Sequence, residues 1–222
     1  MQDIDLRSLF PAARDQGRRE TCVVFAATSG HEYLRYGTTS LMEDLSEEAL
    51  YYQCKVIDGN RNSGTSFDSA GQALQTVGQT GEDKWPYDKR RDETLPDYLP
   101  PPEAVDPQFC YQARLTKIQP DLNAIVACLA QGKPVVIGIS LYDSFNMAPA
   151  GRVPMPRTHE QVVGRHALLA VGCEADDQQS EWLIFRNSWG ARWGENGYGF
   201  LRFEYIGNYG CKAFVVETIT TI

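Results

Sequence analysis

The chain has 222 residues, a length that suits one domain or two small lobes and allows a real hydrophobic core. Hydrophobic residues make up 42% and charged residues 23%, which excludes a disordered or fibrous chain. The formal net charge of −8 argues against a nucleic-acid partner, because contacts to phosphate need clustered Lys and Arg.

Helices are predicted in the N-terminal half of the chain. The stretch 21–36 lacks proline and runs into Gly37, which predicts a helix that stops there. Residues 45–54 predict a second helix, with Ser46 as its N-cap and acidic residues in its first turn. A third helix is predicted at 67–77.

The C-terminal half predicts strands instead. The proline-rich segment 95–107 is not expected to form regular structure and is the best candidate for the connection between the halves. A short helix is predicted at 121–131. Strands rich in β-branched and aromatic residues are predicted at 135–140, 166–173, 181–189, 198–203 and 213–220. The sequence therefore predicts an α+β fold with a helical lobe (roughly 10–115), a β-rich lobe (116–222) and a site in the cleft between them.

Several familiar sites are missing from the sequence. It contains no G-x-x-x-x-G-K-[ST] phosphate loop, no G-x-G-x-x-G fingerprint and no G-x-S-x-G elbow. No two cysteines are spaced C-x-x-C, and the three histidines form no H-x-x-x-H pair. We therefore expect neither a metal nor a cofactor.

The positions of the six cysteines single out one of them. Cys22 lies at the predicted start of the first helix, where the partial positive charge of the helix favours a reactive thiolate. Cys54 lies near a helix C-terminus, where the dipole acts in the opposite sense. Cys128 and Cys173 lie among apolar residues, as small buried core residues do. Cys22 is therefore the candidate nucleophile.

The candidate base for Cys22 is a histidine. His31 would lie roughly 13 Å further along the same helix, at about 1.5 Å per residue, which excludes it. His159 lies in a loop with Pro and Arg, which is typical of a surface position. His166 begins an apolar strand, and a polar ring at a strand end can face a cleft. We therefore expect His166 to be the base.

A third residue should hold this histidine in the required tautomer. The ring presents one nitrogen to the thiol, so its other N–H needs an acceptor. The side-chain carbonyl of Asn187 offers one without adding a negative charge beside the thiolate. Trp189 is expected to cover the hydrogen bond between Asn187 and His166 and to exclude water.

Three segments resemble the papain/cathepsin-like cysteine proteases. QGRRETCVVFA (16–26) resembles the cysteine signature of that family, GRHALLAVG (164–172) its histidine strand, and NSWGARWGENGY (187–198) its asparagine block. The order Cys, His, Asn also suits the family. The resemblance implies a single peptidase domain over 1–222 with the papain-like two-lobed fold. In that fold a helical lobe, whose central helix bears the cysteine, packs against a β-barrel-like lobe.

The resemblance carries four catalytic roles onto matching residues. It implies that Cys22 is the nucleophile, that His166 is the base and then the acid for the leaving amine, and that Asn187 orients His166. Gln16 would supply a side-chain N–H to the oxyanion hole, together with the backbone N–H of Cys22. The implied function is a cysteine endopeptidase that cleaves protein or peptide substrates through a Cys22 acyl-enzyme.

The chain departs from the family around the cysteine. Arg19 stands where the family has a structural cysteine, and the partner position near Asn62 also lacks cysteine. This loss of both halves implies a prokaryotic-type member without the usual disulfides. Cys54 and Cys110 match a further pair, and whether they are bridged depends on the redox compartment, so both states stay open.

The substrate-binding residues come from the same resemblance. Glu20 replaces a glycine that lines the S1 site, so it is either a solvated loop residue or a selector for Arg or Lys before the scissile bond. Gly64 and Thr65 match the segment that binds the substrate backbone. Trp189 is also expected to be a substrate-binding residue. Val216 falls near the floor of S2 and would favour an apolar substrate residue, although an ordinary buried strand residue explains it equally well.

Two other functions stay open. The acyl-enzyme could transfer its acyl group in a transpeptidase or amidase reaction at the same site. Alternatively, the chain could be a catalytically silent module that binds peptides, for which the unusual residues around Cys22 are the only support.

The location of the protein is also open. No apolar run approaches the roughly 18 residues that a membrane span requires, and the N-terminus lacks the apolar core of a signal peptide. We expect a cytoplasmic protein, or one exported without a conventional signal peptide. The chain starts like a mature enzyme, so either its control lies elsewhere or it is a domain excised from a larger protein.

Overall fold

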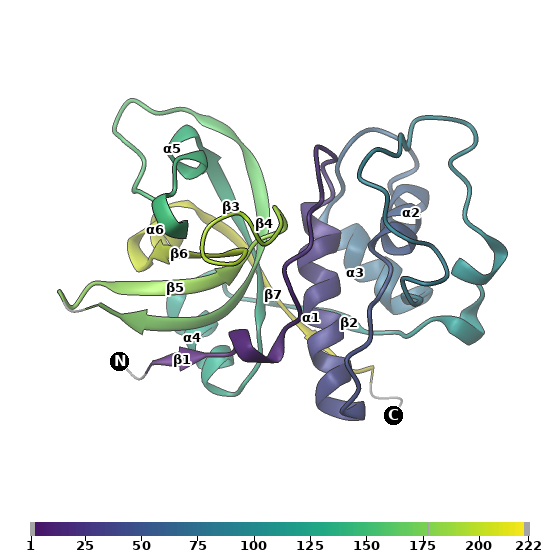
Figure 1. The fold of residues 1–222 in the computed structure, drawn as a ribbon, viewed down its shortest axis with the longest axis horizontal. Helices are drawn as coiled ribbons and strands as arrows, with labels where there is room; N and C mark the ends of the chain where they lie inside the picture. The colour runs from purple at the N-terminus through teal and green to yellow at the C-terminus, as the bar shows by residue number, and fades with distance from the viewer. Residues whose placement is uncertain (1–2, 177, 220–222) are drawn as a thin grey trace. The chain divides into compact units, whose positions relative to one another are not determined.

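The computed structural model describes residues 3–176 and 178–219, except for the side chain of Cys211 (Figure 1). The chain divides into two compact units, a helical one and a β-rich one. The helical unit comprises Gln16–Thr116 and the described residues from Val216 onward, and the β-rich unit comprises residues 3–15 and Lys117–Val215. The expected α+β class is confirmed.

Three helices form the frame of the helical unit. They are α1 (Cys22–Thr39), α2 (Glu47–Asp58) and α3 (Phe67–Thr76). The predicted N-cap of α2 is confirmed, because Ser46 Oγ accepts a hydrogen bond of 3.0 Å from the backbone N–H of Ala49. The predicted stop of α1 at Gly37 is wrong. The helix continues to Thr39, and it is Ser40 that adopts the left-handed conformation (φ 58°) of the C-cap.

The prediction that the proline-rich segment 95–107 connects the two units is wrong. This segment contains the 3-10 turn η2 (Pro102–Ala104), precedes the turn η3 (Pro107–Phe109), and lies within the helical unit. Tyr98 holds it there, because this buried side chain donates a hydrogen bond of 2.8 Å to Glu48. The chain instead passes between the units at Thr116.

A largely antiparallel sheet forms the β-rich unit. Its strands are β1 (Ile4–Asp5), β2 (Arg114–Ile118), β3 (Val135–Tyr142), β4 (Val162–Ala175), β5 (Glu181–Arg186), β6 (Tyr198–Arg202) and β7 (Gly210–Glu217). Their order is β2-β7-β3-β4-β5-β6, with β1 paired to β4. The five predicted strands are all present, although the last was predicted to reach residue 220, which lies outside the described residues. The strands β1, with two residues, and β2, with two charged residues among its five, lack the apolar run on which the prediction depended.

Short helices complete the β-rich unit. They are η1 (Arg7–Leu9), α4 (Leu122–Ala130), α5 (Asp143–Asn146), η4 (Pro149–Gly151) and α6 (Phe203–Tyr209). Asp121 caps α4 by accepting from the N–H of Ala124, which agrees with the helix predicted there. The core lies between the sheet and these helices, and it contains Ile137, Leu168 and Phe185.

Candidate active site

Cys22 is the first residue of α1 and is partly exposed. The segment before it is fixed by Tyr87, whose hydroxyl lies 2.8 Å from Thr21 Oγ1 and donates a hydrogen bond of 2.9 Å to the carbonyl of Gln16. Burial raises the pKa of Tyr87 to about 12, so its hydroxyl remains a donor at neutral pH. The helix N-terminus therefore presents the thiol from a segment that these hydrogen bonds hold in place, in a field that favours the thiolate.

The side chain of Gln16 is buried and held in place. Its Nε2 donates a hydrogen bond of 2.7 Å to the carbonyl of Arg19. A primary amide carries two N–H groups, so this contact orients the amide with one of them. Gln16 and Cys22 belong to the same unit and flank the same short segment.

Two predicted substrate-binding residues lie together in the helical unit. The exposed side chain of Glu20 lies against Gly64. If Gly64 were replaced by a residue with a Cβ atom, that atom would lie 3.2 Å from a carboxylate oxygen of Glu20. Gly64 has φ 82°, a conformation that glycine adopts without strain, and its N–H donates a hydrogen bond of 3.1 Å to the Tyr51 hydroxyl. The neighbouring Thr65 donates from Oγ1 to Asp58, at 3.0 Å.

The histidine and asparagine singled out by the sequence are hydrogen-bonded in the β-rich unit. His166 lies in β4 and Asn187 follows β5, with 2.8 Å between Nε2 of the ring and Oδ1 of the amide. Oδ1 also accepts from the backbone N–H of Ser188, at 2.8 Å, which fixes the orientation of the amide. Because an amide oxygen only accepts, Nε2 carries the proton and Nδ1 is left as the basic nitrogen.

The position of His166 in its strand differs from the prediction. The ring was expected at a strand end, but β4 begins four residues earlier, at Val162, and His166 pairs with Ile139 of β3. The first residues of β4, Val162 and Val163, are more than half exposed. They lie outside the buried apolar run by which the strand was predicted.

Burial sets the protonation state of His166. Removal of the ring from water lowers the pKa of His166 to about 4, and the hydrogen bond with Asn187 opposes this shift. At neutral pH the ring is therefore uncharged and can accept a proton. This is the state that a general base requires.

Aromatic side chains surround the imidazole. The Trp189 ring packs against the His166 ring, with 5.0 Å between the ring centroids and 31° between the ring planes. Covering of the hydrogen bond to Asn187 by Trp189 stays a prediction. Phe145 of α5 is fully buried. The centroid of its ring lies 6.1 Å from that of His166, 5.5 Å from that of Trp189 and 5.9 Å from that of Trp193. Phe145 is not predictable from the sequence, because α5 is one turn long and its contacts come from distant segments.

The remaining predicted binding residue, Val216, lies in β7 and is 7% exposed. Its role in substrate binding stays a prediction. Cys54 and Cys110, whose pairing was left open, are both free thiols in the structure. Burial raises the pKa of Cys54 to about 12 and also raises that of Cys110.

Among the described residues, no group of three or more His, Cys, Asp or Glu side chains is placed to hold a metal ion. In the same part of the chain, no helix has the length and apolar character needed to cross a membrane.

Comparison with known proteins places the chain in a family. The model of the papain family cysteine proteases matches residues 2–218. The chain belongs to the papain family of cysteine proteases. Xylellain, a cysteine protease from Xylella fastidiosa, has a similar structure, with a TM-score of 0.84, 29% identity, and coverage of 98% of this chain and 86% of that chain.

Two curated relatives in this papain family show how much of their length the chain matches. A peptidase C1-like protein of Acanthamoeba polyphaga mimivirus is 26% identical, over 93% of this chain and 70% of the relative. Procathepsin L of Felis catus is 29% identical, over 83% of this chain and 55% of the relative. The chain therefore spans about half the length of the procathepsin. The two-lobed papain-like fold expected from the sequence is confirmed by these likenesses.

Proposed function

We propose that the chain is a cysteine endopeptidase in which Cys22 is the nucleophile and His166 the general base. The observation that carries the proposal is the hydrogen bond between His166 and Asn187, with Trp189 packed against the imidazole. It leaves Nδ1 as the proton acceptor of a ring that burial keeps neutral, which is the form that activates a thiol.

The proposed reaction has two steps. His166 Nδ1 takes the proton of the Cys22 thiol, and the thiolate attacks the peptide carbonyl carbon to give a tetrahedral oxyanion. The N–H groups of the Gln16 side chain and the Cys22 backbone stabilise this oxyanion. When the C–N bond breaks, His166 returns the proton to the leaving amine, and an acyl-enzyme remains. Water then loses a proton to His166 and attacks the thioester, which releases the carboxylic acid and the Cys22 thiol.

Recognition of the substrate is assigned to the region around Glu20. Its carboxylate beside Gly64 is suited to a basic residue before the scissile bond. The N–H of Gly64 already binds Tyr51, so Thr65 is the better candidate for pairing with the substrate backbone. Val216 and Trp189 complete the proposed binding residues.

Selective alkylation of the cysteines tests the proposal. The chain provides its own controls, because Cys54 and Cys173 are buried and burial raises the pKa of both. We expect iodoacetamide to modify Cys22 first below pH 7, with loss of peptide cleavage in proportion. If Cys22 reacts no faster than partly exposed Cys110, the chain is a silent peptide-binding module instead.

Hydrolysis is distinguished from transfer by the products. The acceptor of the acyl group is chosen by access to the Cys22 thioester, so the same residues serve both reactions. We expect product masses to be unchanged when an amine is added. A product that has gained the mass of the amine would assign the transpeptidase activity.

A further inference from the structure

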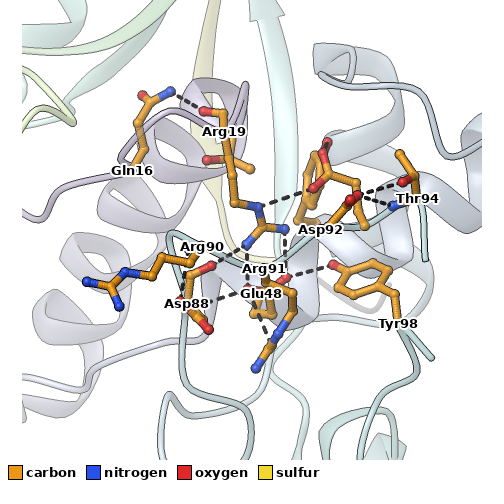
Figure 2. Close-up of polar contacts among 12 residues, drawn as sticks. Gln16, Arg19, Glu48, Asp88, Arg90, Arg91, Asp92, Thr94 and Tyr98 are labelled. Carbon is orange, nitrogen blue, oxygen red and sulfur yellow. Dashed lines mark hydrogen bonds and ion pairs between the residues drawn. The ribbon is translucent and has the colours of Figure 1, made fainter. Parts of the chain in front are cut away.

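A cluster of buried charges surrounds the side chain of Arg19, three residues before Cys22. Its guanidinium group donates two hydrogen bonds to the Glu48 carboxylate, at 2.7 and 2.9 Å, and one to Glu93, at 3.3 Å. It also donates to the carbonyl of Asp88, at 3.0 Å. The side chains of Arg19, Glu48 and Glu93 are each at most 8% exposed. Figure 2 shows the hydrogen bonds from the guanidinium group of Arg19 to Glu48.

Two tyrosines also donate hydrogen bonds to these carboxylates. Tyr98 donates to Glu48 and Tyr51 donates to Glu93, each at 2.8 Å. Burial raises the pKa of both tyrosines above the ordinary range, so their hydroxyls stay protonated. A buried ion pair gains little net stability because its desolvation is costly, so stability alone is a poor explanation for the cluster.

The cluster contacts the proposed site in two places. The backbone carbonyl of Arg19 accepts the hydrogen bond from Gln16 Nε2, at 2.7 Å (Figure 2). The hydroxyl of Tyr51, which donates to Glu93, accepts from the backbone N–H of Gly64, at 3.1 Å. The same buried charges therefore hold both the amide assigned to the oxyanion and the loop assigned to the substrate.

We propose that Arg19 is a positioning residue for peptide cleavage, because its ion pairs with Glu48 and Glu93 fix the carbonyl that orients the Gln16 amide and the loop at Gly64. This inference rests on the proposed function. Arg19 does not touch the reacting atoms, and it acts through Gln16 and Tyr51.

Arg19→Lys is the informative variant. Lysine keeps the positive charge, so Glu48 and Glu93 are not left buried without a counter-charge, but it loses the planar fork that binds Glu48 twice. Loss of an oxyanion donor costs about 10²–10³-fold in kcat, so a misplaced donor should cost roughly tenfold or more, with a smaller change in KM. Tyr98→Phe removes one hydrogen-bond donor to Glu48, so it should also lower kcat, but by less than Arg19→Lys does. The matched control is Arg35→Gln, which removes the ion pair between Arg35 of α1 and Glu43.

A double-mutant cycle with Gln16→Ala separates positioning from general destabilisation. If Arg19 acts through Gln16, Arg19→Lys should lower kcat by less than about twofold in the Gln16→Ala background. If Arg19→Lys lowers kcat by the same factor in the Gln16→Ala background as in the wild-type protein, the proposal is overturned. A wild-type kcat in the single variant Arg19→Lys would overturn it too.

Hydrogen exchange of the Gly64 amide provides a readout that does not depend on catalysis. We expect faster exchange in Arg19→Lys and an unchanged rate in Arg35→Gln. An unchanged rate in both variants would overturn the part of the inference that concerns Gly64. If the wild-type protein shows no Cys22-dependent cleavage, the proposed function fails, while the exchange rate still tests the cluster.

Discussion

His166 donates a hydrogen bond from Nε2 to Asn187 Oδ1, at 2.8 Å, and this contact decides which ring nitrogen can act as a base. Both residues are buried, and the Trp189 ring packs against the His166 ring. Both residues belong to the β-rich unit, so the hydrogen bond between them lies within one unit of the chain. The consequences for catalysis can therefore be tested residue by residue.

Asn187→Ala should lower kcat by about tenfold to a hundredfold, part of the roughly 10²–10⁴-fold that general acid–base catalysis supplies. The cause is loss of the acceptor that holds the His166 tautomer, so KM should change less than kcat. Steady-state kinetics on one peptide measures both constants. The exposed residue Asn208 on α6 provides the control Asn208→Ala, which should leave kcat unchanged. A wild-type kcat in Asn187→Ala would contradict the assigned role.

The pH profile of kcat/KM should report the low pKa of His166. Burial lowers this pKa to about 4, so the ring is neutral above that pH and becomes protonated below it. A protonated ring cannot accept the thiol proton, so the activity should fall on the acid side with a midpoint at about pH 4. The rate is best measured with a peptide that has no titrating group. A midpoint near 6.5, the ordinary value for histidine, would contradict the buried and neutral ring.

His31 should make folding sensitive to acid. It is buried in α1, its Nδ1 lies 3.1 Å from Gln79 Oε1, and burial lowers the pKa of His31 to about 4. In the unfolded chain this histidine takes up a proton near pH 6.5, whereas in the folded chain it does so only near pH 4. The free energy of unfolding is therefore at its full value above pH 6.5 and decreases as the pH falls toward 4. The loss is roughly 3 kcal/mol for each such histidine.

Urea unfolding between pH 7 and pH 4 measures this loss. His31 and His166 have similar shifts, so His31→Gln should make the fall in the free energy of unfolding smaller by roughly 3 kcal/mol. Equal pH dependence in His31→Gln and the wild-type protein would show that His31 is not the titrating group.

Glu20→Gln should weaken any preference for Arg or Lys before the scissile bond. The side chain is exposed, and exposed ion pairs contribute at most about 1 kcal/mol, so the expected change is about two- to fivefold in kcat/KM. The measurement compares fluorogenic peptides that differ only at this residue. The exposed Glu204 offers the control Glu204→Gln. An unchanged preference in Glu20→Gln would assign Glu20 to an ordinary solvated loop.

The parts that were predictable from the sequence depend on local patterns. The N-cap at Ser46 follows from residues within one helical turn, and the pairing of His166 with Asn187 follows from tautomer chemistry joined to a family resemblance. The extension of α1 past Gly37 was missed because Ser40 carries no sign of a left-handed conformation.

The parts that were missed depend on contacts between residues far apart in the chain. Arg19 was noted only for the cysteine it replaces, since its carboxylate partners Glu48 and Glu93 come from distant segments. Phe145 was missed for the same reason, because its contacts with His166 and Trp189 exist only in the folded unit. Single-residue patterns carry no information about such partners.

The most direct test of the central claim is a cleavage profile over a peptide library, read by mass spectrometry, for the wild-type protein and Cys22→Ala. We expect the wild-type protein to cut internal peptide bonds and Cys22→Ala to cut none above background. Equal cleavage by the two proteins would contradict the assignment of Cys22 as the nucleophile, and no cleavage by either would contradict the endopeptidase function.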